Sequence, residues 1–480
     1  MKHKLLTACL LIGLLTPALA SANPEPTAYD SRSIGMGLTG VTYLDHASAL
    51  VLNPANLEGI EKLGFTVNFT ALFVNQRAPV IGPGTRLDSG VGFGPLPSGF
   101  IAGRIAPRVV FAGGIYIETG YGSSFSQVRC LDGATVGGPP DYTPDTDPAT
   151  CLNPTPEDLD VTFFVGEFSA GFSFKAHEKF SLGLALRLPF SKQTADLYQN
   201  IGAATEILAS PTYGRVKNDL GGVGVPSLRF GFTIKPHRKV RISGMYRMAT
   251  KIKLTGTTET ALAPSLPPVT LDGEADWFLP HAVAFGVSYQ ANSHLLLAFE
   301  GRIQFHAAKK SGNQNQTVTA TDPNGAFPDT RLVVPFGWEN AWSAKIGFEY
   351  RFNKDFLALR LGANVAKGAT SAEWAQYFTP PPAPAGLQTV TAGLGFYWDD
   401  RNDPSIKDKY RLDLGGLFAF TKDTIGYEYI GQQALVPGGD PDNPVDNPRI
   451  CSADQVVRTG CPGEYRVYSY WASVSFTLQY

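Results

Sequence analysis

Apolar and polar residues alternate along much of this chain with the period of two that is typical of β-strands. In the C-terminal segment, one parity carries apolar residues from Tyr468 to Tyr480 and the other carries mostly Ser, Thr and Gln. Farther upstream, Phe299 and its apolar neighbours alternate with Glu300 and Arg302, so that charge lies on one face only. The same division recurs in many segments, which favours strands that have one apolar and one polar face.

Strands of this kind across a bilayer predict a closed barrel, because an open sheet would leave unpaired backbone groups in lipid. We therefore expect an all-β transmembrane protein, an antiparallel β-barrel of about 14 strands with its charged parity facing the lumen. The strands are predicted near 63–76, 97–105, 109–121, 159–174, 180–192, 219–234, 239–255, 274–290, 295–309, 335–352, 355–367, 387–399, 410–425 and 465–480.

The connections between these strands alternate between short and long. Short turns are predicted at 106–108, 175–179, 236–238, 291–294 and 353–354, and we assign them to the periplasmic side. The long connections at 122–158, 310–334 and 426–464 are rich in Pro, Gly, Asn and Asp, which favours loops on the outer surface.

The first residues have the form of a secretory signal. Lys2 and Lys4 precede an apolar run from Leu5 to Leu15, and small-residue cleavage patterns follow, so we expect a signal peptide at 1–22 and export through the Sec pathway. Elsewhere no stretch approaches the roughly 18 apolar residues of a membrane helix. The formal charge of −2 becomes −4 without Lys2 and Lys4, which is too near neutral to indicate a nucleic-acid partner.

Residues 23–62 lack strand alternation and are rich in small residues, so they form either a periplasmic tail or a plug inside the lumen. They also carry motifs that resemble the outer-membrane long-chain fatty-acid transporter family, of the FadL and toluene-uptake type. The motifs are Ser33-Ile34-Gly35-Met36-Gly37-Leu38-Thr39-Gly40, Asp45-His46-Ala47-Ser48-Ala49 and Asn53-Pro54-Ala55-Asn56-Leu57. Further matches are Leu96-Pro97-Ser98-Gly99, Gly120-Tyr121-Gly122 and Trp338-Glu339-Asn340-Ala341-Trp342.

The resemblance implies a fourteen-stranded barrel at 63–480, plugged by an N-terminal hatch at 23–62. It further implies passive uptake of hydrophobic small molecules, most of all long-chain fatty acids, which are captured at extracellular loops and released sideways through the wall. In that family the Asn-Pro-Ala motif of the hatch lies beside a kink in the wall. We therefore predict a gate formed by the hatch motif and the glycines of the third strand: Asn53, Pro54, Ala55, Gly113, Gly114 and Gly120.

Lumen-facing arginines are the candidates for binding an anionic head group, because a guanidinium donates charge-assisted hydrogen bonds to a carboxylate. Arg247, Arg302 and Arg351 each lie in the middle of a predicted strand, so we select them. The alternative is that each is paired with a neighbouring carboxylate in the lining of the lumen and binds no substrate.

Four cysteines remain after the signal. Cys130 and Cys151 lie in one long loop and Cys451 and Cys461 in another, and an oxidising compartment favours one local disulfide in each loop. Neither loop contains a histidine, which disfavours a zinc site, and we expect no metal and no cofactor.

Other motifs have weaker functional readings. The Gly35-to-Gly40 pattern matches G-x-G-x-x-G, but no strand precedes it, so we do not expect nucleotide binding. Acidic loop stretches at 141–147 and 440–446 could bind calcium, although their prolines favour plain polar loops. The histidines show no companion motif for catalysis, and we predict that the protein is not an enzyme.

We thus expect a multi-pass barrel in the bacterial outer membrane, functioning as a monomer. Its expected partners are a hydrophobic small-molecule substrate, outer-membrane lipid and lipopolysaccharide, and the barrel-assembly machinery during insertion. Two alternatives stay open: an aromatic-hydrocarbon uptake channel of the same fold, and a surface binding or adhesion protein whose barrel only anchors its loops. A plug segment discriminates against the second alternative, because an anchor needs no hatch.

Overall fold

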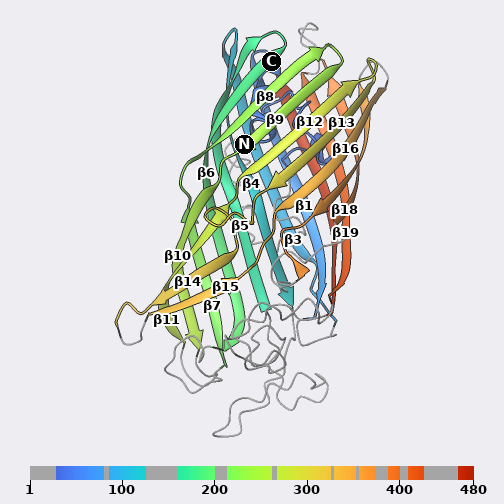
Figure 1. Ribbon diagram of the computed structural model, residues 1–480. Coiled ribbons are helices and arrows are strands. Elements are labelled where there is room, and N and C mark those ends of the chain that lie inside the picture. Colours follow the sequence, from blue (N-terminus) through green and yellow to red (C-terminus); the bar gives the residue numbers. More distant parts are fainter. Residues whose placement is uncertain are drawn as a thin grey trace, which may run out of the picture.

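The computed structural model describes residues 29–79, 86–125, 159–200, 213–261, 268–325, 329–352, 356–372, 387–399, 409–425 and 463–480. All its strands belong to one antiparallel sheet that closes on itself through the pairing of β1 (Leu63–Ala78) with β20 (Gly463–Gln479) (Figure 1). No helix in the described part of the chain is long and apolar enough to cross a membrane.

The remaining strands follow one another around the wall. They are β2 (Leu87–Asp88), β3 (Gly92–Ala106), β4 (Val109–Phe125), β5 (Leu159–His177), β6 (Phe180–Asn200), β7 (Tyr213–Val223), β8 (Ser227–His237), β9 (Val240–Arg247), β10 (Thr250–Ala261), β11 (Val269–Leu279), β12 (Ala282–Gln290), β13 (Leu295–Gln304), β14 (Asn315–Thr321), β15 (Thr330–Pro335), β16 (Ala341–Phe352), β17 (Leu357–Lys367), β18 (Leu387–Trp398) and β19 (Tyr410–Ile425).

These elements make fourteen passes from one end of the barrel to the other, here called crossings, which confirms the predicted antiparallel barrel. Five crossings consist of two consecutive strands each, namely β7–β8, β9–β10, β11–β12, β13–β14 and β15–β16, and β2 is a short extension beside β1. Three of the breaks lie at a proline, which has no N–H group to donate to the ladder. These prolines are Pro226, Pro280 and Pro335. The predicted long loop at 310–334 instead contains the β14–β15 hairpin.

The predicted parity is confirmed by exposure. Large apolar side chains such as Phe299, Ile303 and Leu361 point outward, whereas Arg302 and Arg360 on the other parity are buried inside the barrel. The short connections β3–β4, β5–β6, β8–β9 and β12–β13 all lie at one end, which we call the short-turn end; the opposite end is the loop end.

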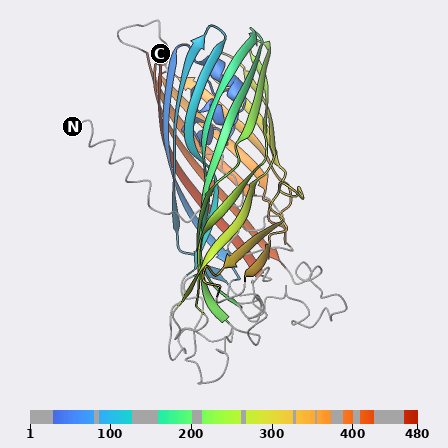
Figure 2. The same cartoon turned by 90° about the vertical axis from the view of Figure 1, so that its left-hand side faces the viewer.

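The N-terminal segment, defined here as residues 29–62, lies inside the barrel toward the short-turn end (Figure 2). It contains α2 (Ser31–Gly35), α3 (Ala49–Leu52) and the 3₁₀ helix η2 (Pro54–Gly59). Asp30 caps α2 by accepting a hydrogen bond from the backbone of Ser33, and Asn53 caps η2, whose first residue is a proline. Nearly all its residues from Tyr29 to Leu57 are buried.

Candidate functional site

The barrel wall is interrupted between β3 and β4. Their ladder runs from the short-turn end to the pair Gly99↔Ile115 and stops there, although both strands continue toward the loop end. On their other sides the strands remain paired, β3 with β1 as far as Gly92 and β4 with β5 as far as Phe125. Beyond this stretch, the backbone N–H of Gly90 donates to the carbonyl of Ser124. The unpaired stretch is therefore bounded by this hydrogen bond toward the loop end and by the end of the ladder toward the short-turn end.

Prolines explain why the β3–β4 ladder stops. The backbone N–H of Arg104 in β3 donates to the carbonyl of Lys62, on the β1 side. Because backbone N–H groups alternate in direction along a strand, those at the odd-numbered positions of β3 point toward β4. Pro95 and Pro97 occupy two of these odd positions and carry no N–H. Two of the donors that β4 would need are therefore missing.

Tyr29 of the N-terminal segment touches both edges of this interruption. Its carbonyl accepts a hydrogen bond from Ser98 of β3 at 3.1 Å, and its hydroxyl donates to the Glu118 carboxylate of β4 at 3.0 Å. Its ring meets that of Tyr116 edge-on at 5.0 Å. Glu118 itself lies at a bulge, where the β4–β5 register shifts between Ile117 and Thr119.

An apolar groove of about 610 Å³ lies on the outer wall at the end of the paired β3–β4 ladder. Gly99, Gly113 and Gly114 line it, together with large apolar side chains that include Ile115 and Phe168. A Cβ on Gly113 would meet nothing closer than 3.8 Å, whereas a Cβ on Gly114 would overlap the ring of Phe100. Two of the predicted gate glycines thus lie where the wall begins to open, and Gly120 lies farther along the unpaired edge of β4.

A buried charge cluster lies behind this part of the wall. Arg187 binds Glu167 through Nε at 3.0 Å, and Arg229 lies 3.4 Å from Glu118 and 3.6 Å from Glu167. Arg247 donates to Glu118 and to the carbonyl of Pro280. Four guanidiniums, with Arg302, therefore surround two carboxylates, and all six side chains are almost completely buried.

The predicted head-group arginines do not share one site. Arg247 and Arg302 both belong to the cluster around Glu118, at which Arg302 points from 3.9 Å. Arg351 lies near the short-turn end, 3.4 Å from Glu349, with its guanidinium 4.4 Å from the ring centre of Tyr397. Each of the three has a carboxylate neighbour, as the alternative of paired charges in the lining of the lumen predicts.

The Asn53-Pro54-Ala55 triplet packs on a different part of the wall from Tyr29. The Asn53 amide donates to the Phe232 carbonyl at 3.2 Å and to Thr233 at 3.0 Å, both in β8. A Cβ on Gly183 of β6 would overlap the backbone of Pro54 and Ala55. The triplet thus contacts β6 and β8, and the 3₁₀ helix η2 that contains Pro54 and Ala55 also packs against β5 and β4, whereas Tyr29 contacts both edges of the interruption.

Wall glycines form the seat of the N-terminal segment. At each of them a Cβ would come within about 3 Å of the segment, so the segment approaches the wall more closely than any larger residue allows. They are Gly183, Gly231, Gly286, Gly347, Gly362, Gly393 and Gly415. Charged contacts add to this seat, since Arg32 forms a bidentate pair with Glu349 at 2.8 Å and Glu300 accepts from the amides of Gly40 and Val41.

We expect Gly183→Ala to displace the N-terminal segment, because the overlap is with its backbone and no side chain can rotate away. The cost should be about 1–3 kcal/mol, typical of an overpacked position. Faster hydrogen exchange at residues 53–57, measured by mass spectrometry on the purified barrel, would show it. Gly301→Ala is the matched control, since its Cβ would meet nothing closer than 4.0 Å.

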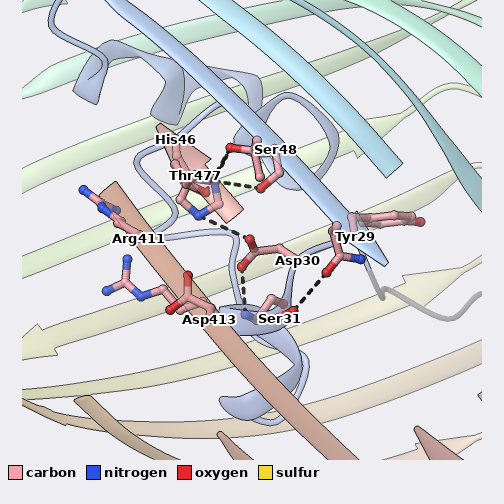
Figure 3. Close-up of polar contacts among 12 residues, drawn as sticks. Tyr29, Asp30, Ser31, His46, Ser48, Arg411, Asp413 and Thr477 are labelled. Atoms are coloured by element: carbon pink, nitrogen blue, oxygen red, sulfur yellow. Dashed lines mark hydrogen bonds and ion pairs between the residues drawn. The ribbon is translucent and has the colours of Figure 1, made fainter. Parts of the chain in front are cut away.

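Ser48, His46 and Asp30 form a chain of polar contacts within the segment (Figure 3). His46 Nδ1 lies 3.0 Å from the Ser48 hydroxyl, and Nε2 lies 3.4 Å from Asp30. The order resembles a nucleophile, base and orienter, but all three side chains are 0% exposed. No substrate can reach Ser48 in this arrangement, so the chain of contacts is a structural feature of the segment.

The docking of the segment should weaken in acid. Burial lowers the pKa of His46 below its ordinary value of 6.5, although Asp30 opposes the shift. Because the docked state disfavours the protonated ring, docking is strongest above about pH 6.5 and weakens as the pH falls below it. The protection factors of residues 30–48, which correct hydrogen exchange for its intrinsic dependence on pH, should therefore fall between pH 7 and pH 5. His46→Asn should flatten this profile, whereas His177→Asn at the exposed end of β5 should not.

An aromatic cluster fills part of the lumen on the loop side of the charges. Trp277 lies 4.5 Å from Phe163 and 5.3 Å from Trp338, measured between ring centres, and Tyr121 lies 5.0 Å from Phe163. The indole N–H groups of Trp277 and Trp338 are buried and have no hydrogen-bond partner among the described residues. The cluster includes Tyr121 and so reaches the unpaired edge of β4.

Several predicted features fall elsewhere. The signal peptide and all four loop cysteines, Cys130, Cys151, Cys451 and Cys461, lie outside the described residues. In the described ranges, no group of three or more His, Cys, Asp or Glu side chains is arranged to hold a metal ion.

Sequence reasoning missed Glu118, Glu167 and Tyr29. Glu167 lies on the other face of its strand from Phe168 and Phe172. The alternation that placed Arg302 in the lumen would therefore have placed Glu167 there as well. No local signal marks Tyr29, because its role depends on two strands that are distant in sequence.

The fold matches solved transporter structures over almost the whole chain. A Pseudomonas aeruginosa FadL homologue aligns at 15% identity and a TM-score of 0.68, over 95% of this chain and 99% of its own. The Ralstonia pickettii toluene transporter TbuX aligns at 16% identity and a TM-score of 0.66, and the Pseudomonas putida toluene transporter TodX at 15% and 0.66, with the same coverage of both chains. No protein-family profile and no curated protein sequence matches the chain.

Proposed function

From the FadL-type channel fold that this chain shares with these transporters, we propose that the protein is a passive outer-membrane transporter that releases hydrophobic molecules sideways through the β3–β4 interruption. The observation that carries the proposal is the end of the ladder at Gly99↔Ile115 with an apolar groove outside it. Lateral release keeps the apolar surface of a substrate out of water, which is worth about 0.8 kcal/mol per methylene.

The N-terminal segment serves as the hatch of this transporter. It occupies the lumen at the short-turn end, which we assign to the periplasm, and so blocks axial passage. Tyr29 holds together the two edges of the lateral exit, through Ser98 on β3 and Glu118 on β4. Movement of Tyr29 is the step that opens the wall. The Asn53-Pro54-Ala55 triplet anchors the hatch to β6 and β8, while Gly113, Gly114 and Gly120 shape the exit.

The substrate is a hydrophobic molecule that carries an oxygen acceptor, with long-chain fatty acids the first choice. The rings of Trp277, Trp338 and Phe163 offer an apolar surface, but the two buried indole N–H groups need an acceptor that a plain hydrocarbon lacks. Arg247 and Arg302 supply positive charge behind the aromatic cluster and are the head-group candidates there. Arg351 is too close to the short-turn end to serve the same head group.

Aromatic hydrocarbons are the second candidate substrate class, favoured by the concentration of rings in the lumen. The toluene transporters TbuX and TodX share the fold. Under either substrate class the protein is a monomeric barrel that is exported through the Sec pathway and inserted by the barrel-assembly machinery.

Substitution of the two tryptophans separates these substrate classes. Trp277→Phe with Trp338→Phe keeps the rings and removes both donors, so uptake of radiolabelled oleate should fall about tenfold while toluene uptake stays unchanged. Cells that lack the gene and carry each variant provide the assay, with Trp342→Phe on the outer wall as the control. Failure of wild-type protein to restore uptake of either compound would disprove the proposed function.

A further inference from the structure

A polar cavity of about 320 Å³ opens at the short-turn end, between the N-terminal segment and the barrel wall. Arg32, Tyr43 and Asp45 of the segment line one side. The opposite side comes from the β8–β9 turn, the β12–β13 turn and the adjoining ends of β9, β12, β13 and β16. The cavity lies far along the barrel from the β3–β4 interruption and from the aromatic cluster, and the proposed transport function does not use it.

The two carboxylates that line the cavity are already engaged. Glu349 accepts two hydrogen bonds from Arg32 and a third from Arg360 at 2.7 Å. Asp45 binds Arg411 at 2.8 Å and has Arg32 at 3.5 Å. Burial raises the pKa of Asp45, but Arg411 and Arg32 lower it more, so this carboxyl remains charged and committed to these partners.

Of the four barrel-side arginines and lysines that line the cavity, Arg351 lies 3.4 Å from Glu349, whereas the other three have no such carboxylate among the described residues. Arg238 and Lys239 lie in the β8–β9 turn, and Arg241, the second residue of β9, lines the cavity. Lys239 donates to the carbonyl of Ala291, which fixes its ammonium group at the rim. Among the described residues, no carboxylate lies within ion-pair distance of these three cations. The cavity thus carries a local excess of positive charge with hydrogen-bond donors on several sides.

We propose that this cavity binds a phosphate-type oxyanion, either free or as the head group of a phospholipid. Arg241 is the central donor, and a guanidinium matches the geometry of phosphate oxygens. Ser288 and Ser293 supply neutral donors on the β12–β13 side. Because Tyr43 and Arg32 belong to the segment and Arg241 to the wall, the bound anion connects the two and stabilises the docked segment.

Titration of the full-length purified barrel with inorganic phosphate tests the site. Calorimetry should show saturable binding to the wild type, weakened about tenfold or more by Arg241→Gln, since a charge-assisted hydrogen bond is lost. Phosphate should also slow hydrogen exchange at residues 31–45 in the wild type and not in the variant. Arg108→Gln is the matched control, because Arg108 is exposed in a turn at the same end and does not line the cavity.

Nanodiscs distinguish the two sources of the anion. If the ligand is a lipid head group, native mass spectrometry should find phosphatidylglycerol retained by the wild type over phosphatidylcholine, and Arg241→Gln should lose it. If the ligand is a free oxyanion, phosphate should bind in detergent and no lipid preference should appear. Absence of both signals, or equal loss with Arg108→Gln, would overturn the proposal. A shift in gel mobility on heating that equals that of the wild type shows that each variant is folded.

Discussion

Linking β3 to β4 beyond the end of their ladder should abolish substrate uptake. Pro97 and Ile117 are the next positions that would face each other if the register of Gly99↔Ile115 continued. Cysteines at both, joined by a disulfide or a short bismaleimide, would hold the two edges together. Because the proposed exit lies between these strands, a substrate that entered the lumen would then have no route to the bilayer. The measurement is uptake of labelled oleate before linking, after linking and after reduction of the disulfide.

The control for this experiment links strands that are already paired. Ala392→Cys with Gly416→Cys joins β18 to β19 at an existing pair on the outer face, so it should leave uptake unchanged. Wild-type protein treated with the same reagents accounts for the native cysteines. Full uptake through a barrel whose β3–β4 link is verified by mass spectrometry would rule out lateral release and favour axial passage past the N-terminal segment.

The sequence predicted the barrel well because one physical constraint acts on every strand. A residue such as Phe299 faces lipid and its neighbour Glu300 faces the lumen, so membrane burial imposes alternation wherever a strand crosses. The ends of β1, β19 and β20 agree with the predicted segments within a few residues. The breaks in five crossings were not predicted, since alternation continues on both sides of a break such as the one at Pro280.

The sequence carries a signal for the interruption of the wall on each of the two strands beside it. The glycines of the third strand predict a weak point there, and Pro95 and Pro97 of the second strand, whose effect was not predicted, remove the donors that a ladder requires. Two prolines inside a segment bounded by alternating strands indicate an unpaired edge. Gly113 and Gly114 contribute by shaping the groove, and they remain paired with Ile101 and Phe100.

The seat of the N-terminal segment could not be predicted from one sequence. Gly183, Gly362 and Gly415 are separated by long stretches of chain, and only closure of the barrel brings them against the same short segment. Alternation places such glycines on the lumen face but does not say what they contact. The carboxylate of Glu349 poses the same problem, because its partner Arg32 lies in a segment with no regular pattern.

Removal of the Glu349 charge should release the N-terminal segment from the wall. Glu349 accepts from Arg32 of the segment and from Arg360 of β17, and all three side chains are almost fully buried. Glu349→Gln would leave these guanidiniums without their shared countercharge in a site that excludes water. Breaking a buried pair in this way costs about 3–5 kcal/mol, because the remaining charge stays desolvated. Asp413, 2.7 Å from Arg360, would compensate part of the loss on the barrel side only.

The cost should fall on the docking of the segment, since the strands keep their backbone ladders. Hydrogen exchange at residues 31–45 should accelerate by at least about a hundredfold, and single-channel conductance should rise as the lumen opens. Glu339→Gln is the matched control, because its pair with Lys367 is exposed and exposed pairs contribute only about 0–1 kcal/mol. A double variant, Arg32→Met with Glu349→Met, removes both partners and should recover part of the protection. Equal exchange rates in Glu349→Gln and the wild type would mean that the glycine seat alone holds the segment, with the ion pairs contributing nothing measurable.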